Sequence, residues 1–308
     1  MSRVGLRRSA QEYLALRRAL GFKLRAETWF LPDFVAFLGE QRSAVITTEL
    51  ALRWVQKPGD ASAAWWAHRL SSIRSFAKYH RAFDPRTEVP PADLISHQPR
   101  RRQPHIYSDE EIIRLMREAR ALRGALRSAT YVAIIGLLAV TGMRLGEALG
   151  LDEADVDWAR SLLIIRHAKF QKSRLVPVHR STLTALRAYA DRRNRLCPHR
   201  RNPAFFVSGV GARVHPQNFQ RVFLRLLARA GVNAQCGRRP RIHDLRHAFA
   251  VKTLCDWYRS GGDAERRLWW LSTYLGHVSP TTTYWYLTAT PELLSLAGKR
   301  LARSQVRR

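Results

Sequence analysis

Cysteine is scarce in this chain, and long runs without a charged residue or a histidine are absent. The three cysteines, Cys197, Cys236 and Cys255, have no paired spacing, so they predict neither a disulfide framework nor a CxxC metal site. A reduced, cytoplasmic setting is the simpler expectation. The longest run without a charged residue or a histidine, Ser128–Met143, has 16 residues, whereas a membrane-spanning helix needs roughly 20. The N-terminus has no signal-peptide pattern. We therefore expect no membrane association, and we interpret the run as a buried helix.

Acidic residues are few as well. The chain has 24 Asp and Glu against 53 Lys and Arg, for a formal net charge of +29. Such a surplus favours a polyanionic partner, and nucleic acid is the strongest candidate because neutralised phosphates release counterions. A basic protein from an arginine-rich proteome and a protein that binds acidic membranes remain alternatives. Apolar residues make up 46% of the chain, which excludes a disordered basic tail.

Lysine is the rare basic residue, with 7 lysines among the 53 basic positions. A G+C-rich genome would explain this bias without any chemistry. Between Lys78 and Lys252, however, the only lysines are Lys169 and Lys172. A lysine can donate a proton once its pKa is lowered, whereas an arginine cannot do so near neutral pH. This pair is therefore a candidate for acid chemistry.

The predicted architecture is mainly α-helical with a small β-hairpin, in two domains. A helical domain is expected over residues 1–88 and a second domain over residues 107–308. Between them, residues 89–106 are rich in proline and arginine, which is typical of a stiff linker. Thr47–Thr48 predicts a helix start. Ser108 with Glu111 predicts a capping box that begins the first helix of the second domain.

A long helix is predicted over Ala63–Phe83. Its apolar positions are Trp65, Trp66, Leu70, Ile73 and Phe76. Its polar side carries a basic strip that consists of Arg69, Arg74, Lys78 and Arg81. The strip suits a DNA groove or, equally, a solvated helix face.

The only clear β signal lies in two short segments. Ser161–Ala168 and Ser173–His179 predict two strands, with Lys169 at the tip of the turn between them. Helices are expected again from Ile242 onward. The two strands therefore predict a hairpin that can carry a lysine into a cleft.

Arginine, histidine and tyrosine positions suggest phosphate chemistry. Arg144 follows a glycine turn and begins a helix, where free N–H groups favour a phosphate. Glu147, one turn later, can hold the guanidinium in place. His243 and Arg246 lie three residues apart on a predicted helix, so they share a face. The joint pattern predicts a phosphodiester site without a metal, since HExxH, CxxC and GxxxxGK[ST] motifs are lacking.

Four segments resemble the motif boxes of the tyrosine recombinase family, the phage integrases and Xer-type recombinases. They are TGMRLGEALGL (141–151), KFQKSRLVPV (169–178), HDLRHAFA (243–250) and LGH (275–277). The resemblance implies six catalytic residues: Arg144, Lys169, His243, Arg246, His277 and Tyr286. Tyr286 is the implied nucleophile because it follows His277 by nine residues. Tyr284 is the competing position, and two residues on a helix are about 200° apart, so only one can face a given phosphate.

The resemblance also implies a function. The first domain would be a helical DNA core-binding domain, and residues 107–308 the catalytic domain. Together they would act as a homo-tetramer on two double-stranded DNA sites, with accessory recombinases as further partners. The enzyme would cut and rejoin DNA through a 3′-phosphotyrosine, without metal or ATP, to integrate or move a mobile element. A type IB topoisomerase-like enzyme and a non-catalytic architectural DNA-binding protein are the alternatives.

Overall fold

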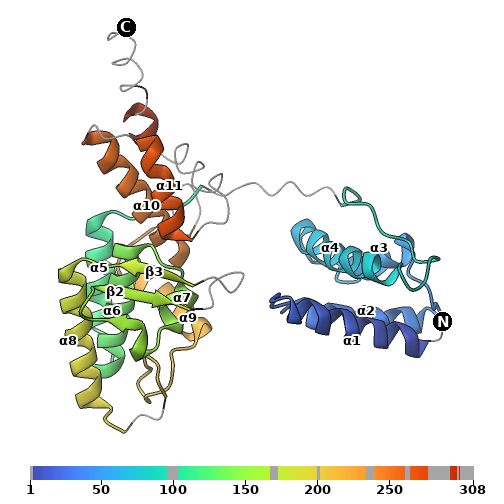
Figure 1. Cartoon of the computed structure of the whole chain (residues 1–308), viewed down its shortest axis with the longest axis horizontal. Helices are drawn as coiled ribbons and strands as arrows, with labels where there is room; N and C mark the ends of the chain where they lie inside the picture. The colour runs from blue at the N-terminus through green and yellow to red at the C-terminus, as the bar shows by residue number, and fades with distance from the viewer. Residues whose placement is uncertain are drawn as a thin grey trace. The chain divides into compact units, whose positions relative to one another are not determined.

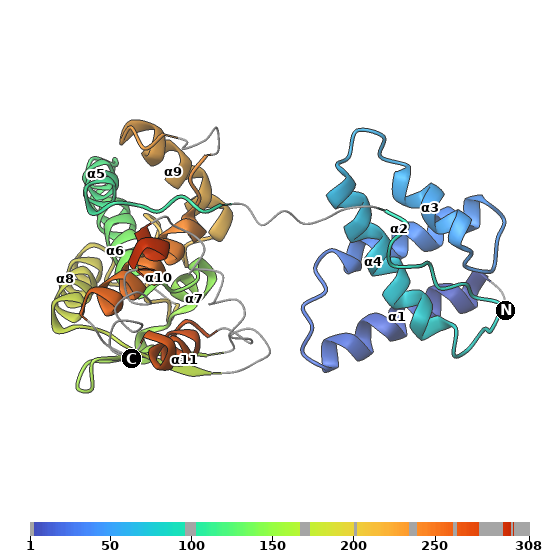
Figure 2. The ribbon, with the colours of Figure 1, turned by 90° about the horizontal axis from the view of Figure 1, so that it is seen from above.

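The computed structural model describes residues 3–95, 103–166, 173–199, 202–233, 239–260, 264–276, 292–296 and 298. The chain divides into two compact units, Met1–Arg101 and Arg102–Arg308, each of which is shown from two directions in Figures 1 and 2. The predicted linker, residues 89–106, spans this division point, and its residues 96–102 lie outside the described part. Each unit has its own hydrophobic core.

The first unit is built from four helices. They are α1 (Arg3–Ala19), α2 (Glu27–Glu40), α3 (Thr48–Gln56) and α4 (Ala63–His80). Thr47 caps α3, as predicted, because its side chain accepts a hydrogen bond from the Leu50 N–H. Phe34, Trp54 and Phe76 are fully buried between the helices. This aromatic core explains why the short helices are stable, since most helix stability in proteins comes from packing.

Helix α4 departs from its prediction in three ways. It ends at His80 rather than at Phe83. Of the predicted core positions, Trp65 is 43% exposed. Arg69, predicted on the exposed basic strip, is buried: its Nη2 donates to the Trp54 carbonyl at 2.9 Å, and its guanidinium lies 3.6 Å from the centre of the Trp54 ring. The prediction for Arg69 was wrong because a carbonyl and an aromatic face together replace its water shell.

The second unit is mainly helical around a small sheet (Figure 1). Its elements are α5 (Asp109–Arg120), α6 (Ala125–Thr141), α7 (Leu145–Gly150), the 3-10 helix η1 (Glu153–Asp155), β1 (Val156–Asp157), β2 (Leu162–Ile165), β3 (Arg174–Pro177), α8 (Arg180–Leu196), α9 (Pro216–Arg229), α10 (Ile242–Arg259) and α11 (Ala264–Leu275). The Ser108–Glu111 capping box at the start of α5 is confirmed. Helix α6 lies in the middle, in contact with α5, α7, α8 and α10. It contains most of the uncharged run, which is therefore a buried helix as predicted.

The sheet has three antiparallel strands in the order β1-β2-β3. Strands β2 and β3 form the predicted hairpin, with Leu163 opposite Val176, and both side chains are buried. Strand β1 was not predicted, because two residues carry no alternation of apolar and polar positions. The hairpin turn, residues 167–172, lies outside the described residues.

No helix in the described part of the chain is long and apolar enough to cross a bilayer. Of the region from Ile242 onward in which helices were predicted, the part after residue 276 is described only at residues 292–296 and 298.

Candidate active site

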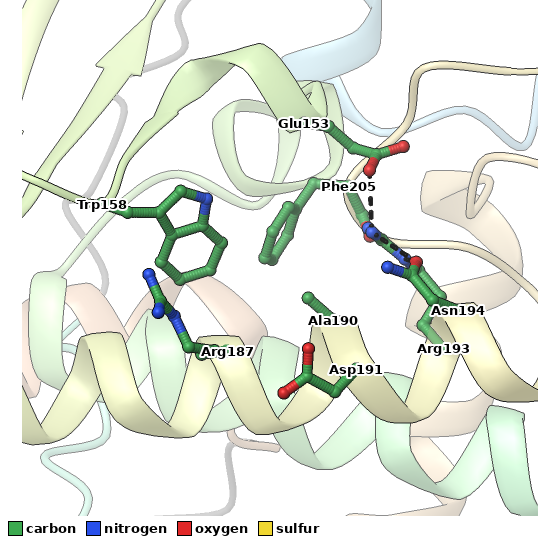
Figure 3. A pocket seen from close by; sticks show the side chains of 8 residues that line it. All are labelled: Glu153, Trp158, Arg187, Ala190, Asp191, Arg193, Asn194 and Phe205. Carbon is green, nitrogen blue, oxygen red and sulfur yellow. Dashed lines mark hydrogen bonds and ion pairs between the residues drawn. The ribbon is translucent and has the colours of Figure 1, made fainter.

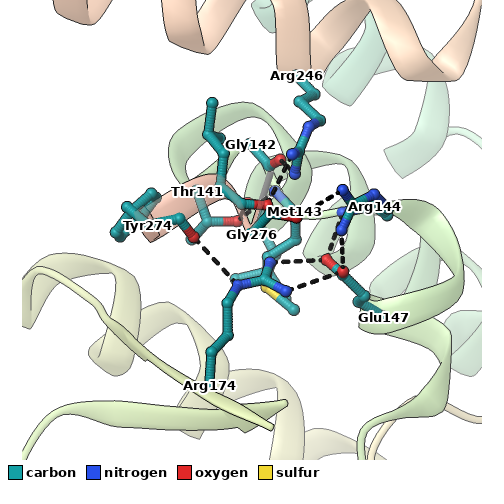
Figure 4. A network of polar contacts seen from close by, with 11 residues as sticks. Thr141, Gly142, Met143, Arg144, Glu147, Arg174, Arg246, Tyr274 and Gly276 are labelled. Carbon is teal, nitrogen blue, oxygen red and sulfur yellow. Dashed lines mark hydrogen bonds and ion pairs between the residues drawn. The ribbon is translucent and has the colours of Figure 1, made fainter. Parts of the chain in front are cut away.

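Three arginines converge on the C-terminal end of α11 (Figure 4). Three consecutive carbonyls there each accept a hydrogen bond from a different guanidinium. The Tyr274 carbonyl accepts from Arg174 Nε at 3.1 Å. The carbonyls of residues 275 and 276 accept from Arg246 Nη2 at 2.7 Å and from Arg144 Nη2 at 3.0 Å. The last carbonyls of a helix lack intrahelical donors and carry partial negative charge, so this end of α11 stabilises three cations.

Arg144 lies at the turn between α6 and α7. Gly142 forms this turn in the left-handed conformation, with φ of 60°. A Cβ at Gly142 would lie 2.6 Å from Cδ1 of Phe249, so both the backbone and the space require glycine. Arg144 follows as the residue that caps α7, and its side chain is 30% exposed. Of the three guanidiniums, that of Arg144 is the one most open to solvent, and therefore to a phosphate.

Glu147 holds Arg144, as the sequence predicted. Its Oε1 accepts from Arg144 Nη1 at 2.7 Å, and its Oε2 accepts from the Arg144 backbone N–H at 2.9 Å. The same carboxylate also accepts two hydrogen bonds from Arg174, at 2.9 and 2.8 Å. Burial alone would raise the pKa of Glu147, but the hydrogen bonds and charges of Arg174 and Arg144 outweigh it and lower the pKa to about 2. Glu147 is therefore a permanent anion between two cations.

Arg246 and His243 come from the first turns of α10. Arg246 is buried, and its Nη1 donates to the Gly142 carbonyl at 2.9 Å, so it ties the α6–α7 turn to the end of α11. His243 has an exposed side chain on the same helix. Its pKa is lowered, first because neighbouring protein atoms displace part of its water and then because of the charges of Arg246 and Arg144. A neutral imidazole can accept a proton near neutral pH.

His247 lies beside His243 and was missed by the sequence analysis. The two rings meet edge to face, with centroids 4.8 Å apart. Burial, followed by the nearby His243, lowers the pKa of His247 to about 4, so this ring is neutral too. The signal that could have found it is the spacing of four residues after His243, which puts both rings on one helix face.

The structure thus brings together Arg144, His243 and Arg246, three of the six predicted catalytic residues. The other three, Lys169, His277 and Tyr286, lie outside the described residues, as do Lys172 and Tyr284. Arg174 is the second residue that the sequence analysis missed. The signal that could have found it among 46 arginines is its place inside the motif box KFQKSRLVPV (169–178).

A separate cavity of about 260 Å³ opens between α8 and the segment around η1 and β1 (Figure 3). It is lined by Glu153, Trp158, Arg187, Ala190, Asp191, Arg193, Asn194 and Phe205. Arg193 donates to the Phe205 carbonyl and to Glu153, and Arg187 lies over the Trp158 ring. These contacts link α8 to η1 and to the segments at Trp158 and Phe205, and the lining includes none of Arg144, His243 and Arg246, the predicted catalytic residues that the structure describes. The arginine cluster at the end of α11 is therefore the candidate active site.

The fold of this chain, mainly helical and in two units, is similar to that of solved structures. The solved structure of the XerH site-specific recombinase bound to its palindromic difH substrate superposes with a TM-score of 0.67 and 19% identity, over 94% of this chain and 84% of that one. The fold is therefore that of the tyrosine recombinases.

The sequence comparisons define the family. Residues 107–292 match the model of the phage integrase family. A Sinorhizobium fredii protein named as an integrase/recombinase, y4rB, is 47% identical over 96% of this chain and 97% of its own length. The tyrosine recombinase XerC of Myxococcus xanthus is 33% identical over 86% of both chains. The chain belongs to the phage integrase family and is a tyrosine recombinase by descent.

Proposed function

We propose that this chain is a site-specific DNA recombinase that cuts and rejoins duplex DNA through a 3′-phosphotyrosine on Tyr286. The observation that carries the proposal is the cluster of Arg144, Arg246 and a neutral His243 at one helix end. Membership of the tyrosine recombinase family supports it.

The reaction uses the charges of the cluster. Attack of the Tyr286 oxygen on the phosphorus forms a P–O bond, and the bond from phosphorus to the 5′-oxygen breaks. Negative charge grows on the nonbridging oxygens, where Arg144 and Arg246 stabilise it without a metal. His243 takes the tyrosine proton or hydrogen-bonds to it, Lys169 protonates the departing 5′-oxygen to give the 5′-hydroxyl, and His277 contacts the phosphate.

The phosphotyrosine retains the energy of the broken phosphodiester. A 5′-hydroxyl from a second DNA strand displaces the tyrosine and restores the protein, so no ATP is consumed. In this proposal residues 1–88 form the core-binding domain, residues 89–106 the linker and residues 107–308 the catalytic domain. Four copies act on two DNA sites, and exchange of strands between the sites integrates or moves a mobile element.

Covalent trapping tests the proposal. Duplexes that the protein selects from a random-sequence pool are resynthesised with a nick near each candidate cleavage position and incubated with protein in EDTA. We expect an SDS-resistant protein–DNA adduct from the wild type and from Tyr284→Phe, but none from Tyr286→Phe. Loss of the adduct only in Tyr284→Phe would move the nucleophile to Tyr284.

Two further outcomes would contradict the proposal. Tight binding without any adduct would favour an architectural DNA-binding protein. Relaxation of a supercoiled plasmid that lacks the selected site would favour the topoisomerase alternative, because that enzyme reseals the strand it has cut and needs no partner site.

A further inference from the structure

Arg174 connects three separate segments of the site. It begins β3, directly after the hairpin turn, and its side chain is 14% exposed. Its two terminal nitrogens donate to the two carboxylate oxygens of Glu147, at 2.9 and 2.8 Å. Its Nε donates to the Tyr274 carbonyl at 3.1 Å. One partly buried guanidinium thus joins the hairpin, α7 and the end of α11.

The contacts of Arg174 close a ring of hydrogen bonds in which Arg144 is a member (Figure 4). Glu147 binds both arginines. Arg144 in turn donates to the Gly276 carbonyl, two residues beyond the Tyr274 carbonyl that Arg174 holds. Each guanidinium is therefore restrained through the same carboxylate and the same turn. A carboxylate held by two arginines cannot rotate away from either without losing charge-assisted hydrogen bonds.

Gly276 shows how closely Arg174 packs on this turn. A Cβ built at Gly276 would lie 2.9 Å from Nη1 of Arg174. The residue also has φ of 67°, which is the left-handed region that favours glycine. The guanidinium therefore lies against the backbone of Gly276.

Arg174 itself has little left to offer a phosphate. Three of its five N–H groups donate to Glu147 and to a carbonyl, and its side chain is 14% exposed against 30% for Arg144. Its effect on a bound phosphate would therefore be exerted through Arg144 and through the turn.

We propose that Arg174 is a positioning residue for DNA cleavage, which holds the Glu147 carboxylate and the Tyr274–Gly276 turn so that the Arg144 guanidinium is kept in place for the phosphate. This inference rests on the proposed function. Arg174 links the hairpin to the rest of the site through one side chain, so that the position of the hairpin and the position of Arg144 depend on each other.

The test compares Arg174→Met with Arg193→Met. Arg193 is an equally suitable buried arginine, because it also binds a carboxylate, that of Glu153, and a backbone carbonyl, that of Phe205, but it lies away from the ring. Single-turnover cleavage of a nicked duplex, DNA affinity and melting temperature are measured for each variant. We expect Arg174→Met to cleave about 100-fold more slowly at saturating protein, since a displacement of about 1 Å costs that much, with DNA affinity within about threefold of the wild type. Arg193→Met is expected to lower the melting temperature but to cleave at the wild-type rate.

Two rescue measurements separate positioning from folding. Arg174→Lys keeps the charge but not the two-pronged geometry, so we expect an intermediate rate. Added ethylguanidine is expected to restore part of the rate of Arg174→Ala and to leave that of Arg193→Ala unchanged.

Two results would overturn the inference and are distinguishable. If the wild type cleaves DNA and Arg174→Met cleaves at the same rate, the role of Arg174 is rejected but the proposed function is not. The same holds if Arg174→Met and Arg193→Met lose equal amounts of cleavage rate. A wild type that binds DNA but forms no adduct would reject the proposed function, and with it any role of Arg174 in cleavage.

Discussion

The two units bury arginine in different ways. In the first unit Arg69 lies on the ring of Trp54 and donates to the carbonyl of the same residue. Asp33 lies 3.8 Å from it but is largely exposed. In the second unit Arg144, Arg174 and Arg246 share one helix end, and Arg144 and Arg174 also share the buried carboxylate of Glu147.

The difference lies in what the partners connect. Arg69 stabilises the contact between two neighbouring helices, α3 and α4. The second set joins segments 27 to 132 residues apart in the sequence, from the α6–α7 turn to the end of α11. Burial of an arginine by itself is therefore no sign of a reaction site. Shared partners drawn from distant segments are the better sign, because a reaction needs those segments held together.

Arg144 provides the largest expected effect. Arg144→Met removes the exposed guanidinium of the cluster, and we expect the single-turnover cleavage rate to fall about 1,000-fold, the upper range for loss of one transition-state donor. Arg213→Met is the matched control, because Arg213 is similarly exposed, pairs with Asp152 and donates to the Leu149 carbonyl. Its rate should stay within about threefold of the wild type. If the cleavage rates of Arg144→Met and Arg213→Met fell by similar factors, the arginine cluster would have no special role in cleavage.

Glu147 should make the stability of the second unit depend on acid. Its pKa in the folded chain is about 2, below the ordinary 4.5. The stabilisation is therefore fully present above about pH 5 and is lost as the pH falls towards 2. This shift corresponds to about 3 kcal/mol at neutral pH.

Urea unfolding of the wild type and Glu147→Gln between pH 7 and pH 2.5 measures this effect. We expect the wild type to be the more stable protein at pH 7 and the difference to shrink steadily below pH 5. A difference that stayed constant with pH would show that the two arginines do not depress this pKa.

Arg69, the buried arginine of the first unit, is expected to affect stability and not cleavage. Arg69→Met leaves the buried Trp54 carbonyl without this donor and removes the cation over the ring, so we expect a loss of about 1–2 kcal/mol in the free energy of unfolding. Cleavage of bound DNA should not change. Arg74→Met, on the more open side of the same helix, should cost less than about 0.5 kcal/mol. Urea unfolding followed by far-UV circular dichroism distinguishes the two, and equal losses would contradict the buried role of Arg69.

Local elements were predictable where a short-range pattern exists. The caps at Thr47 and Ser108, the buried α6 and the strands β2 and β3 were all expected and are confirmed. Strand β1 was not, because two residues are too few to show an alternation of apolar and polar positions. Arg69 was misplaced because the ring that shelters it belongs to a different helix.

The site shows the same division. The contact between Arg144 and Glu147 follows from a spacing of three residues at a helix start and was predicted. The contacts of Arg174 with Glu147 and with the Tyr274 carbonyl cross 27 and 100 residues, and no periodicity reports them. Lys169, His277 and Tyr286 remain predictions that rest on the family motifs.

The sequence by itself determined the family, the charge that favours a nucleic acid and the helix that Arg144 begins, because motif spacing, composition and capping are local properties. The tertiary structure alone decided that three arginines meet at one helix end and that a single buried carboxylate serves two of them. The physical reason is that a buried charge must find its partners wherever folding brings them. In this protein those partners come from α7, β3 and α11.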